Sequence, residues 1–374
     1  MKPSIAMFFC GLLSVICVSR AALSKRQHVV LADSHLFVGG EPFIVKGVCW
    51  NPILPGETFP AGLPWFAKGF DEPLNEEDRT LIVQDLQLMK EAGINTVRTY
   101  LPIVNLETLE LLKKFEIYQI VPTLNFYKVS LEDVKHLVDS LKSHPTTLFW
   151  ELGNEWNYNR LYSEGSHHLS LSEVTDKLVK AGNMIRQMDP YHPISTSYGE
   201  LPYFSKEGED KPGLLSKKDF QRIDGVVDAW GLNVYSGDTF KNSQGTPRAV
   251  VMKELSHKPI YFSEYGADAF NAHGRSIDED AQAFATYKLT KEIVDELAWQ
   301  KKGGNVLGGT IFEFSDEWWK APGAPEHHDE GGHAPGGGPH PDGIFNEEFW
   351  GVVTIDREPR KAYFELAKIY KSLP

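Results

Sequence analysis

Residues 76–101, EEDRTLIVQDLQLMKEAGINTVRTYL, contain a helical pattern followed directly by a strand pattern. Apolar residues recur at helical spacing over residues 81–92, and Gly93 follows at the position where helices favour glycine. A short β-branched run begins at Thr96. The stretch therefore predicts a helix over residues 76–92 and a strand over 96–101, which together form one unit of an α/β fold.

The same alternation continues along the whole chain. Further strands are predicted at residues 43–49, 119–124, 147–152, 194–197, 229–234, 260–263 and 307–314. Further helices are predicted at residues 106–115, 131–143, 171–188, 247–255, 279–300 and 361–371. This pattern predicts a single (β/α)8 TIM barrel, with long loops after strands one and eight. A doubly wound parallel sheet is the alternative, although no glycine-rich dinucleotide fingerprint follows the first strand.

The N-terminus has the features of a secretory signal peptide. Lys2 supplies a positive charge, residues 5–18 are almost wholly apolar, and the small residues Ser19 and Ala21 suit a cleavage site. The apolar run is too short to cross a bilayer. We expect a signal peptide over residues 1–21 and a secreted, extracellular catalytic domain over residues 22–374; a short membrane anchor is the alternative.

Net charge narrows the classes of binding partner, and cysteine content limits the possible disulfides. The 38 Lys and Arg residues against 51 Asp and Glu residues give a net charge of 38 − 51 = −13. Without a basic tract, this balance argues against binding to nucleic acid or to an anionic membrane. Cys10 and Cys17 lie in the predicted leader, so Cys49 alone remains and no intrachain disulfide is expected. A neutral partner fits this composition best.

An apolar strand that ends in glutamate occurs twice. Residues 149–156, FWELGNEW, end the fourth predicted strand, and residues 260–266, IYFSEYG, end the seventh. A carboxyl group among aromatic side chains is partly desolvated, which raises its pKa and suits a general acid. In a barrel the tips of these two strands face each other across the mouth. Either glutamate alone could be a salt-bridge or capping residue, but the pair favours acid–base chemistry.

Two carboxyl groups placed in this way are typical of glycosidases. A separation of about 5 Å gives a retaining pair, whereas about 6.5–9.5 Å gives inversion. The residues resemble the clan A superfamily of retaining β-glycosidases, through GNEW at 153–156 and SEYG at 263–266. The resemblance covers about residues 35–373. It is similar to the barrels of families 2, 5 and 72, through FIVKGV at 43–48 and DLQLMKEAGINTVR at 85–98.

The resemblance implies a role for five residues. Glu155 corresponds to the acid/base and Glu264 to the nucleophile, while Asn154 corresponds to the residue that binds the sugar 2-hydroxyl. Arg98 would hold the nucleophile ionised, and Tyr235 would donate a hydrogen bond to it. Both of these roles are physically reasonable, because a cation within about 4–6 Å favours a charged carboxylate and a phenol fixes its orientation.

The sequence departs from the family pattern in two places. Residues 230–235, WGLNVY, have Asn233 where many members of the clan have histidine. Family 2 enzymes carry β-sandwich domains before the barrel, and the few residues that precede Phe43 leave no room for them. The resemblance therefore implies an enzyme that consists of the barrel alone.

Aromatic and amide side chains near the strand ends are candidates for sugar binding. Aromatic rings stack on the C–H faces of sugars, whose hydroxyl groups need polar partners. The candidate aromatic residues are Trp50, Trp156, Tyr127, Trp318 and Trp319, of which Trp318 is the strongest because it follows the eighth strand. The candidate polar residues are Asn51, Asn125, Asp316 and Glu317. Any one of these tryptophans could equally be core packing.

The tract over residues 321–341 is rich in His, Gly and Pro. Its possible metal ligands are His327, His328, Asp329, His333 and His340. Their spacing matches no zinc pattern, so we expect a solvated loop and no metal or other cofactor.

The sequence therefore predicts a secreted retaining β-glycoside hydrolase that acts on a β-linked oligo- or polysaccharide, such as β-mannan or β-glucan. One alternative is a β-glucan transglycosylase that uses the same site. A second is a catalytically silent carbohydrate-binding or matrix protein, and a third is a metal-dependent hydrolase that uses the histidine tract.

Overall fold

The computed structural model describes residues 29–57, 74–163, 168–201, 203–206, 210–320 and 342–374. The predicted leader at residues 1–21, with Cys10 and Cys17, lies outside the described residues, as does the histidine tract at 321–341.

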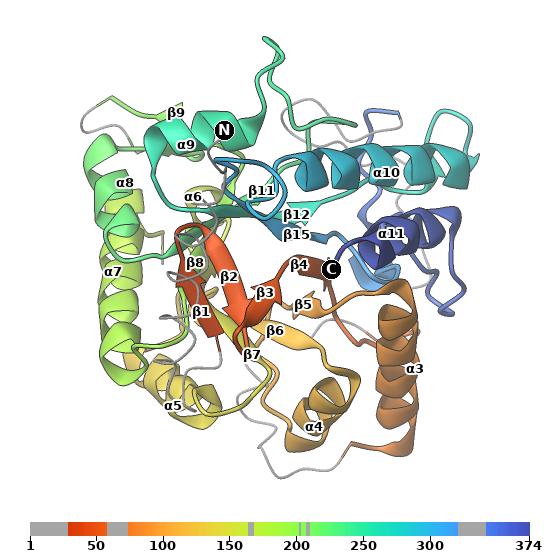
Figure 1. The fold of residues 1–374 in the computed structure, drawn as a ribbon, viewed down its shortest axis with the longest axis horizontal. Coiled ribbons are helices and arrows are strands. Elements are labelled where there is room, and N and C mark those ends of the chain that lie inside the picture. Colours follow the sequence, from red (N-terminus) through yellow and green to blue (C-terminus); the bar gives the residue numbers. More distant parts are fainter. Residues whose placement is uncertain (1–28, 58–73, 164–167, 202, 207–209, 321–341) are drawn as a thin grey trace, which may run out of the picture.

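Eight parallel strands close into a barrel, as the alternating pattern predicts (Figure 1). In chain order they are β4 Val45–Cys49, β5 Thr96–Arg98, β6 Tyr118–Pro122, β7 Thr147–Asn154, β8 Ile194–Gly199, β11 Ala229–Asn233, β12 Ile260–Tyr265 and β15 Val306–Ile311. Neighbouring strands in the barrel follow the order of the chain, and β15 pairs with β4. Every described residue of β5, β7, β8, β11, β12 and β15 is buried, because helices cover the outside and side chains fill the inside.

Helices form a ring around the strands (Figure 1). They are α3 Glu76–Ala92, α4 Leu106–Phe115, α5 Leu131–Leu141, α6 Trp156–Asn159, α7 Leu171–Met188, α8 Lys217–Asp224, α9 Arg248–Leu255, α10 Glu279–Asp295 and α11 Lys361–Ser372. Local signals set the ends of α3. Asn75 accepts a hydrogen bond from the backbone N–H of Asp78, and Gly93 ends the helix with a φ of 78°.

The elements that were not predicted include one helix of the ring and a small sheet. Helix α8, between β8 and β11, has the sequence KKDFQRID, in which few apolar residues mark a buried face. The segment before β4 forms a three-stranded antiparallel sheet, β1 Val29–Ala32, β2 His35–Val38 and β3 Glu41–Phe43. Its residues Leu36 and Val38 pack in one cluster with Val45, Ile120 and Leu307 of the barrel strands. This sheet therefore covers the end of the barrel at which the strands begin.

The remaining elements lie in the loops. They are the strand pairs β9 Tyr203–Phe204 with β10 Leu214–Leu215 and β13 Phe270–Asn271 with β14 Ser276–Ile277, and the 3-10 helices η2 Trp318–Lys320 and η3 Glu347–Phe349. In the part of the chain that the structure describes, no helix is both long and apolar enough to cross a membrane.

The seam between β15 and β4 closes the barrel. Thr310 pairs with Gly47 across it, and a Cβ atom on Gly47 would lie 2.4 Å from Cγ2 of Thr310. Glycine is therefore required for the two strands to approach this closely. The hydroxyl of Tyr370, in α11, donates a hydrogen bond of 3.1 Å to the carbonyl oxygen of Gly47. The last helix of the ring thus also fixes the first strand of the barrel.

Candidate active site

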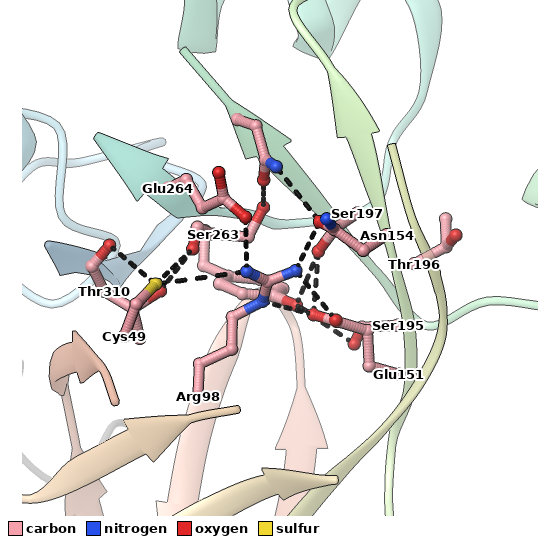
Figure 2. A network of polar contacts seen from close by, with 12 residues as sticks. Cys49, Arg98, Glu151, Asn154, Ser195, Thr196, Ser197, Ser263, Glu264 and Thr310 are labelled. Atoms are coloured by element: carbon pink, nitrogen blue, oxygen red, sulfur yellow. Dashed lines mark hydrogen bonds and ion pairs between the residues drawn. The ribbon is translucent and has the colours of Figure 1, made fainter. Parts of the chain in front are cut away.

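A buried arginine lies at the centre of the polar residues that end the barrel strands (Figure 2). Arg98 is the last residue of β5 and is fully buried. Its Nη1 atom donates to Oε1 of Glu264 at 2.8 Å, and its Nε and Nη2 atoms donate to Glu151 at 2.8 and 2.9 Å. Nη2 also donates to Oδ1 of Asn154 at 2.7 Å. One guanidinium therefore orients three side chains from β7 and β12, in the planar geometry for which arginine is suited.

Glu264, near the end of β12, receives three hydrogen bonds. Besides Arg98, the hydroxyl of Tyr100 donates to Oε1 at 2.7 Å and the hydroxyl of Tyr235 donates to Oε2 at 2.8 Å. All three groups donate to the Glu264 carboxyl group, so they fix its orientation. The contacts predicted for Arg98 and Tyr235 with Glu264 are present.

Glu155 lies at the turn between β7 and α6, in the left-handed region with a φ of 45°. Its Oε1 atom accepts a hydrogen bond of 3.1 Å from Nδ2 of Asn233, the residue that replaces the histidine expected from the family pattern. Burial, and then the charge of Glu264, raise the pKa of Glu155 to about 8. The two glutamates of the sequence motifs are thus electrostatically coupled, and one carries a proton at neutral pH.

Asn154 connects the two glutamates. Its Oδ1 atom accepts hydrogen bonds from Arg98 at 2.7 Å and from Nδ2 of Asn233 at 3.0 Å. Its Nδ2 atom donates to the hydroxyl of Tyr162 at 3.1 Å. The side chain is therefore held in one orientation beside both carboxyl groups, although the predicted contact with a sugar hydroxyl is not tested.

Glu151 was not selected from the sequence, although it lies in the same motif as Glu155. It is fully buried in β7, and besides Arg98 it accepts hydrogen bonds from Ser197 Oγ at 2.7 Å and Tyr261 Oη at 2.8 Å. The available signal was a glutamate in the middle of an apolar strand, since such a residue requires a buried cation.

Tyr100 was also missed. It lies two residues after Arg98, and this spacing places side chains on the same face of an extended chain. Its ring packs 6.4 Å from that of Phe312, which also lies 6.1 Å from the ring of Tyr235. The two tyrosines that bind Glu264 therefore share one aromatic support.

Replacing Tyr100 by Phe is expected to lower kcat about tenfold to a hundredfold, because a hydrogen bond to a charged group contributes about 1.5–3 kcal/mol. Steady-state kinetics on an aryl β-glycoside, the substrate class that the sequence predicts, would measure the effect, with the melting temperature as a check on folding. Unchanged kcat would show that Tyr100 does not orient Glu264.

Two predicted sugar platforms are wrong. The ring of Trp50 is 1% exposed and donates its indole N–H to Asp85 at 2.9 Å. The ring of Trp156 is 0% exposed and donates to Oγ1 of Thr196 at 2.8 Å. Both are core residues with a satisfied N–H group, so neither face is available to a sugar.

Two other predicted binding residues contact residues of the site or of its loops, whereas Asp316 is buried and forms an ion pair with Arg360 at 2.6 Å. Nδ2 of Asn125 donates to the carbonyl oxygen of Tyr100 at 2.9 Å, and Nδ2 of Asn51 donates to Oε1 of Glu317 at 2.5 Å. Trp318 is partly exposed in η2, after β15. Their roles in sugar binding remain predictions.

A lysine and three glutamates form a second charged group beside the site. Nζ of Lys320 lies 2.8 Å from Glu317 and 3.3 Å from Glu347, and 4.4 Å from the ring centroid of Phe312. Burial and the neighbouring charge of Glu317 raise the pKa of Glu313 well above its usual range. Lys320 therefore forms its ion pairs with Glu317 and Glu347 beside a carboxyl group whose ionisation is disfavoured.

Metal ligation has no support in the described residues, where no three His, Cys, Asp or Glu side chains are grouped to hold an ion. The histidine tract lies outside them.

Comparisons with known proteins give structural matches alone. No protein-family model and no curated protein matches the sequence. The fold is similar to the GH2 β-galacturonidase of Eisenbergiella tayi bound to galacturonate, at 16% identity and a TM-score of 0.58, over 93% of this chain and 55% of that one. It is also similar to the β-D-glucuronidase of Dictyoglomus thermophilum, at 20% identity and a TM-score of 0.54, over 92% of this chain and 54% of that one. A third similar structure is the β-glucuronidase of Faecalibacterium prausnitzii, at 19% identity and a TM-score of 0.55, over 92% of this chain and 52% of that one.

The chain thus spans about half the length of these structures. At these identities the matches show the fold, a (β/α)8 barrel such as GH2 glycosidases contain.

Proposed function

We propose that the protein is an exported retaining β-glycoside hydrolase that acts on an uncharged β-linked oligo- or polysaccharide, such as β-mannan or β-glucan. One observation carries the proposal. Glu264 is held by hydrogen bonds from Arg98, Tyr100 and Tyr235, which orient it for attack, while Glu155 has a pKa of about 8, which favours a carboxylic acid. A retaining mechanism needs an oriented nucleophile and a protonated acid in one site.

The reaction proceeds in two displacements. Glu264 forms a bond to the anomeric carbon as the bond to the leaving oxygen breaks, and Glu155 gives its proton to that oxygen. Glu155 then takes a proton from water as the water oxygen attacks the anomeric carbon, which releases Glu264. Asn154 lies beside both carboxyl groups, where it can bind the 2-hydroxyl of the reacting sugar.

The charges of the site support an uncharged substrate. Arg98 is paired with Glu151 and Glu264, and Lys320 is paired with Glu317 and Glu347. An anionic sugar that bound to either of these two cations would have to displace a carboxylate from it, at the cost of leaving a charge unpaired. This favours a neutral sugar over the uronic acids for which the structural neighbours are named.

The proposal is tested by labelling. A 2-deoxy-2-fluoro-β-glycosyl fluoride of glucose or mannose should form a stable adduct, and mass spectrometry should place it on the peptide that contains Glu264. In parallel, neutral aryl β-glycosides should be hydrolysed with at least tenfold higher kcat/KM than the matching β-glucuronide. If correctly folded protein forms no adduct and hydrolyses none of these glycosides, the proposal is contradicted.

The pH dependence of activity follows from Glu155. Because its pKa is raised to about 8, the proton needed by the leaving oxygen is present at neutral pH and is lost as the pH rises through that value. We expect kcat/KM for an unactivated oligosaccharide to fall above about pH 8. In the Glu155→Gln variant, a 2,4-dinitrophenyl glycoside, whose leaving group needs no proton, should show no such fall.

A further inference from the structure

Tyr162 has an aromatic ring at the candidate site that the mechanism above does not use. The residue is 40% exposed, yet its hydroxyl accepts a hydrogen bond of 3.1 Å from Nδ2 of Asn154. Burial of the hydroxyl, and then the charge of Glu155, raise the pKa of Tyr162 well above its ordinary value. The hydroxyl end therefore lies among the catalytic groups while part of the side chain remains accessible.

The backbone that carries Tyr162 is held in an unfavourable conformation. Arg160, Leu161 and Tyr162 have φ values of 51°, 62° and 44°, and each left-handed residue other than glycine costs about 1–2 kcal/mol. Such strain persists only where surrounding contacts impose it, and it is concentrated at functional sites.

The contacts that impose this conformation come from the site itself. Nδ2 of Asn159 donates to the carbonyl oxygen of Asn154 at 2.7 Å, and Oδ1 of Asn159 accepts from the backbone N–H of Tyr162 at 3.1 Å. Leu161 is fully buried, and its carbonyl oxygen accepts a hydrogen bond of 2.7 Å from the backbone N–H of Tyr127. Tyr162 is thus fixed relative to Asn154 and Glu155.

A second ring supports the first. The rings of Phe126 and Tyr162 lie 5.2 Å apart at an angle of 31°, and Phe126 is partly buried against the main core cluster. An exposed ring that is immobilised from behind is suited to stacking, because little conformational entropy is lost when a ligand binds.

We propose that Tyr162, supported by Phe126, binds a sugar ring on the leaving-group side of the cleaved bond. This inference rests on the proposed function. The leaving oxygen must lie within reach of Glu155, and Tyr162 follows Glu155 on the same loop, next to Asn154. A second sugar attached to that oxygen would place its C–H face on the phenol ring. The substrate is then an oligosaccharide with at least one ring beyond the cleaved bond.

The test compares a substrate that has this ring with one that lacks it. The first is whichever of mannotriose, cellotriose and laminaritriose the purified full-length protein cleaves fastest, and the second is the β-glycosyl fluoride of the same sugar. In Tyr162→Ala we expect kcat/KM to fall on the trisaccharide, mostly through a higher KM, by at least about tenfold more than it falls on the fluoride, which reports any loss caused by the missing contact with Asn154.

Two variants separate stacking from other effects. Tyr162→Phe keeps the ring but loses the hydroxyl that accepts from Asn154, so any loss should be the same on both substrates and the ratio of the two kcat/KM values should stay within about threefold of the wild-type ratio. Tyr191 has a similar exposure, 45%, and lies just before β8 begins, at the opposite end of the barrel. Tyr191→Ala should therefore leave kcat/KM unchanged on both substrates.

Each outcome decides the matter. An unchanged trisaccharide reaction in Tyr162→Ala would overturn the inference, as would equal losses on both substrates or a Tyr162→Phe variant with the same selective loss on the trisaccharide as Tyr162→Ala. If wild type turns over neither substrate and Glu264 takes no label, the proposed function itself fails.

Discussion

The Glu264→Ala variant should lose at least about ten-thousand-fold in kcat on any β-glycoside, because it has no group to attack the anomeric carbon. The loss should come without unfolding. Arg98 keeps its two hydrogen bonds to Glu151, and Tyr100 and Tyr235 can turn their hydroxyl groups to water in the space that the carboxylate leaves. Steady-state kinetics would measure the loss in kcat, and a thermal melt on the same preparation would show whether the fold persists.

Azide distinguishes a lost nucleophile from general damage. In Glu264→Ala the anion can enter the vacated space and attack an activated aryl β-glycoside, which gives the α-glycosyl azide. Wild type and a control variant at the exposed Glu132, Glu132→Ala, should give no such product. Full activity in Glu264→Ala would rule out the assignment, and a rescued product of β configuration would exclude direct attack by azide from the side of the missing carboxylate.

The Glu151→Ala variant should lose about 3–5 kcal/mol of unfolding free energy, the cost of removing one member of a buried ion pair. Glu151 accepts four hydrogen bonds, two from Arg98 and one each from Ser197 and Tyr261. All four donors are buried, and without the carboxylate they lose a partner that water cannot easily replace. Urea unfolding followed by tryptophan fluorescence would give the change.

A matched surface variant sets the baseline. Glu132 forms an exposed ion pair with Lys135, so Glu132→Gln should change the unfolding free energy by less than about 1 kcal/mol. If Glu151→Ala were as stable as Glu132→Gln, the hydrogen bonds of Glu151 with Arg98, Ser197 and Tyr261 would contribute little to the stability of the barrel.

The sequence predicted the barrel well because its signals are local and repeated. Most barrel strands contain a short β-branched or apolar run, and helices such as α3 have both a buried face and end signals, so periodicity was sufficient. Helix α8 was missed because its eight residues are mostly charged, and its buried Phe220 and Ile223 give too short a pattern. The sheet β1–β3 was missed because strands of three or four residues show little alternation.

The site was only partly predictable, because the motifs locate strand ends but not the direction of each side chain. Glu155 and Glu264 stand at strand ends with aromatic neighbours, which was enough to select them. A position near a strand end misled the assignment of Trp50 and Trp156, whose indole groups turn into the core to meet Asp85 and Thr196. Glu151 could be recognised only through Arg98, a partner on another strand.

The seam between β15 and β4 has a consequence for how the chain acquires its fold. Thr310 meets Gly47 only when strands from opposite ends of the barrel sequence come together, so this pairing has a large loop-closure cost. Until then β4 has an unpaired edge, which is a template for association with other chains. A slow folding phase, and aggregation of chains that have not yet closed the ring, are therefore expected at this one junction more than at the seven others.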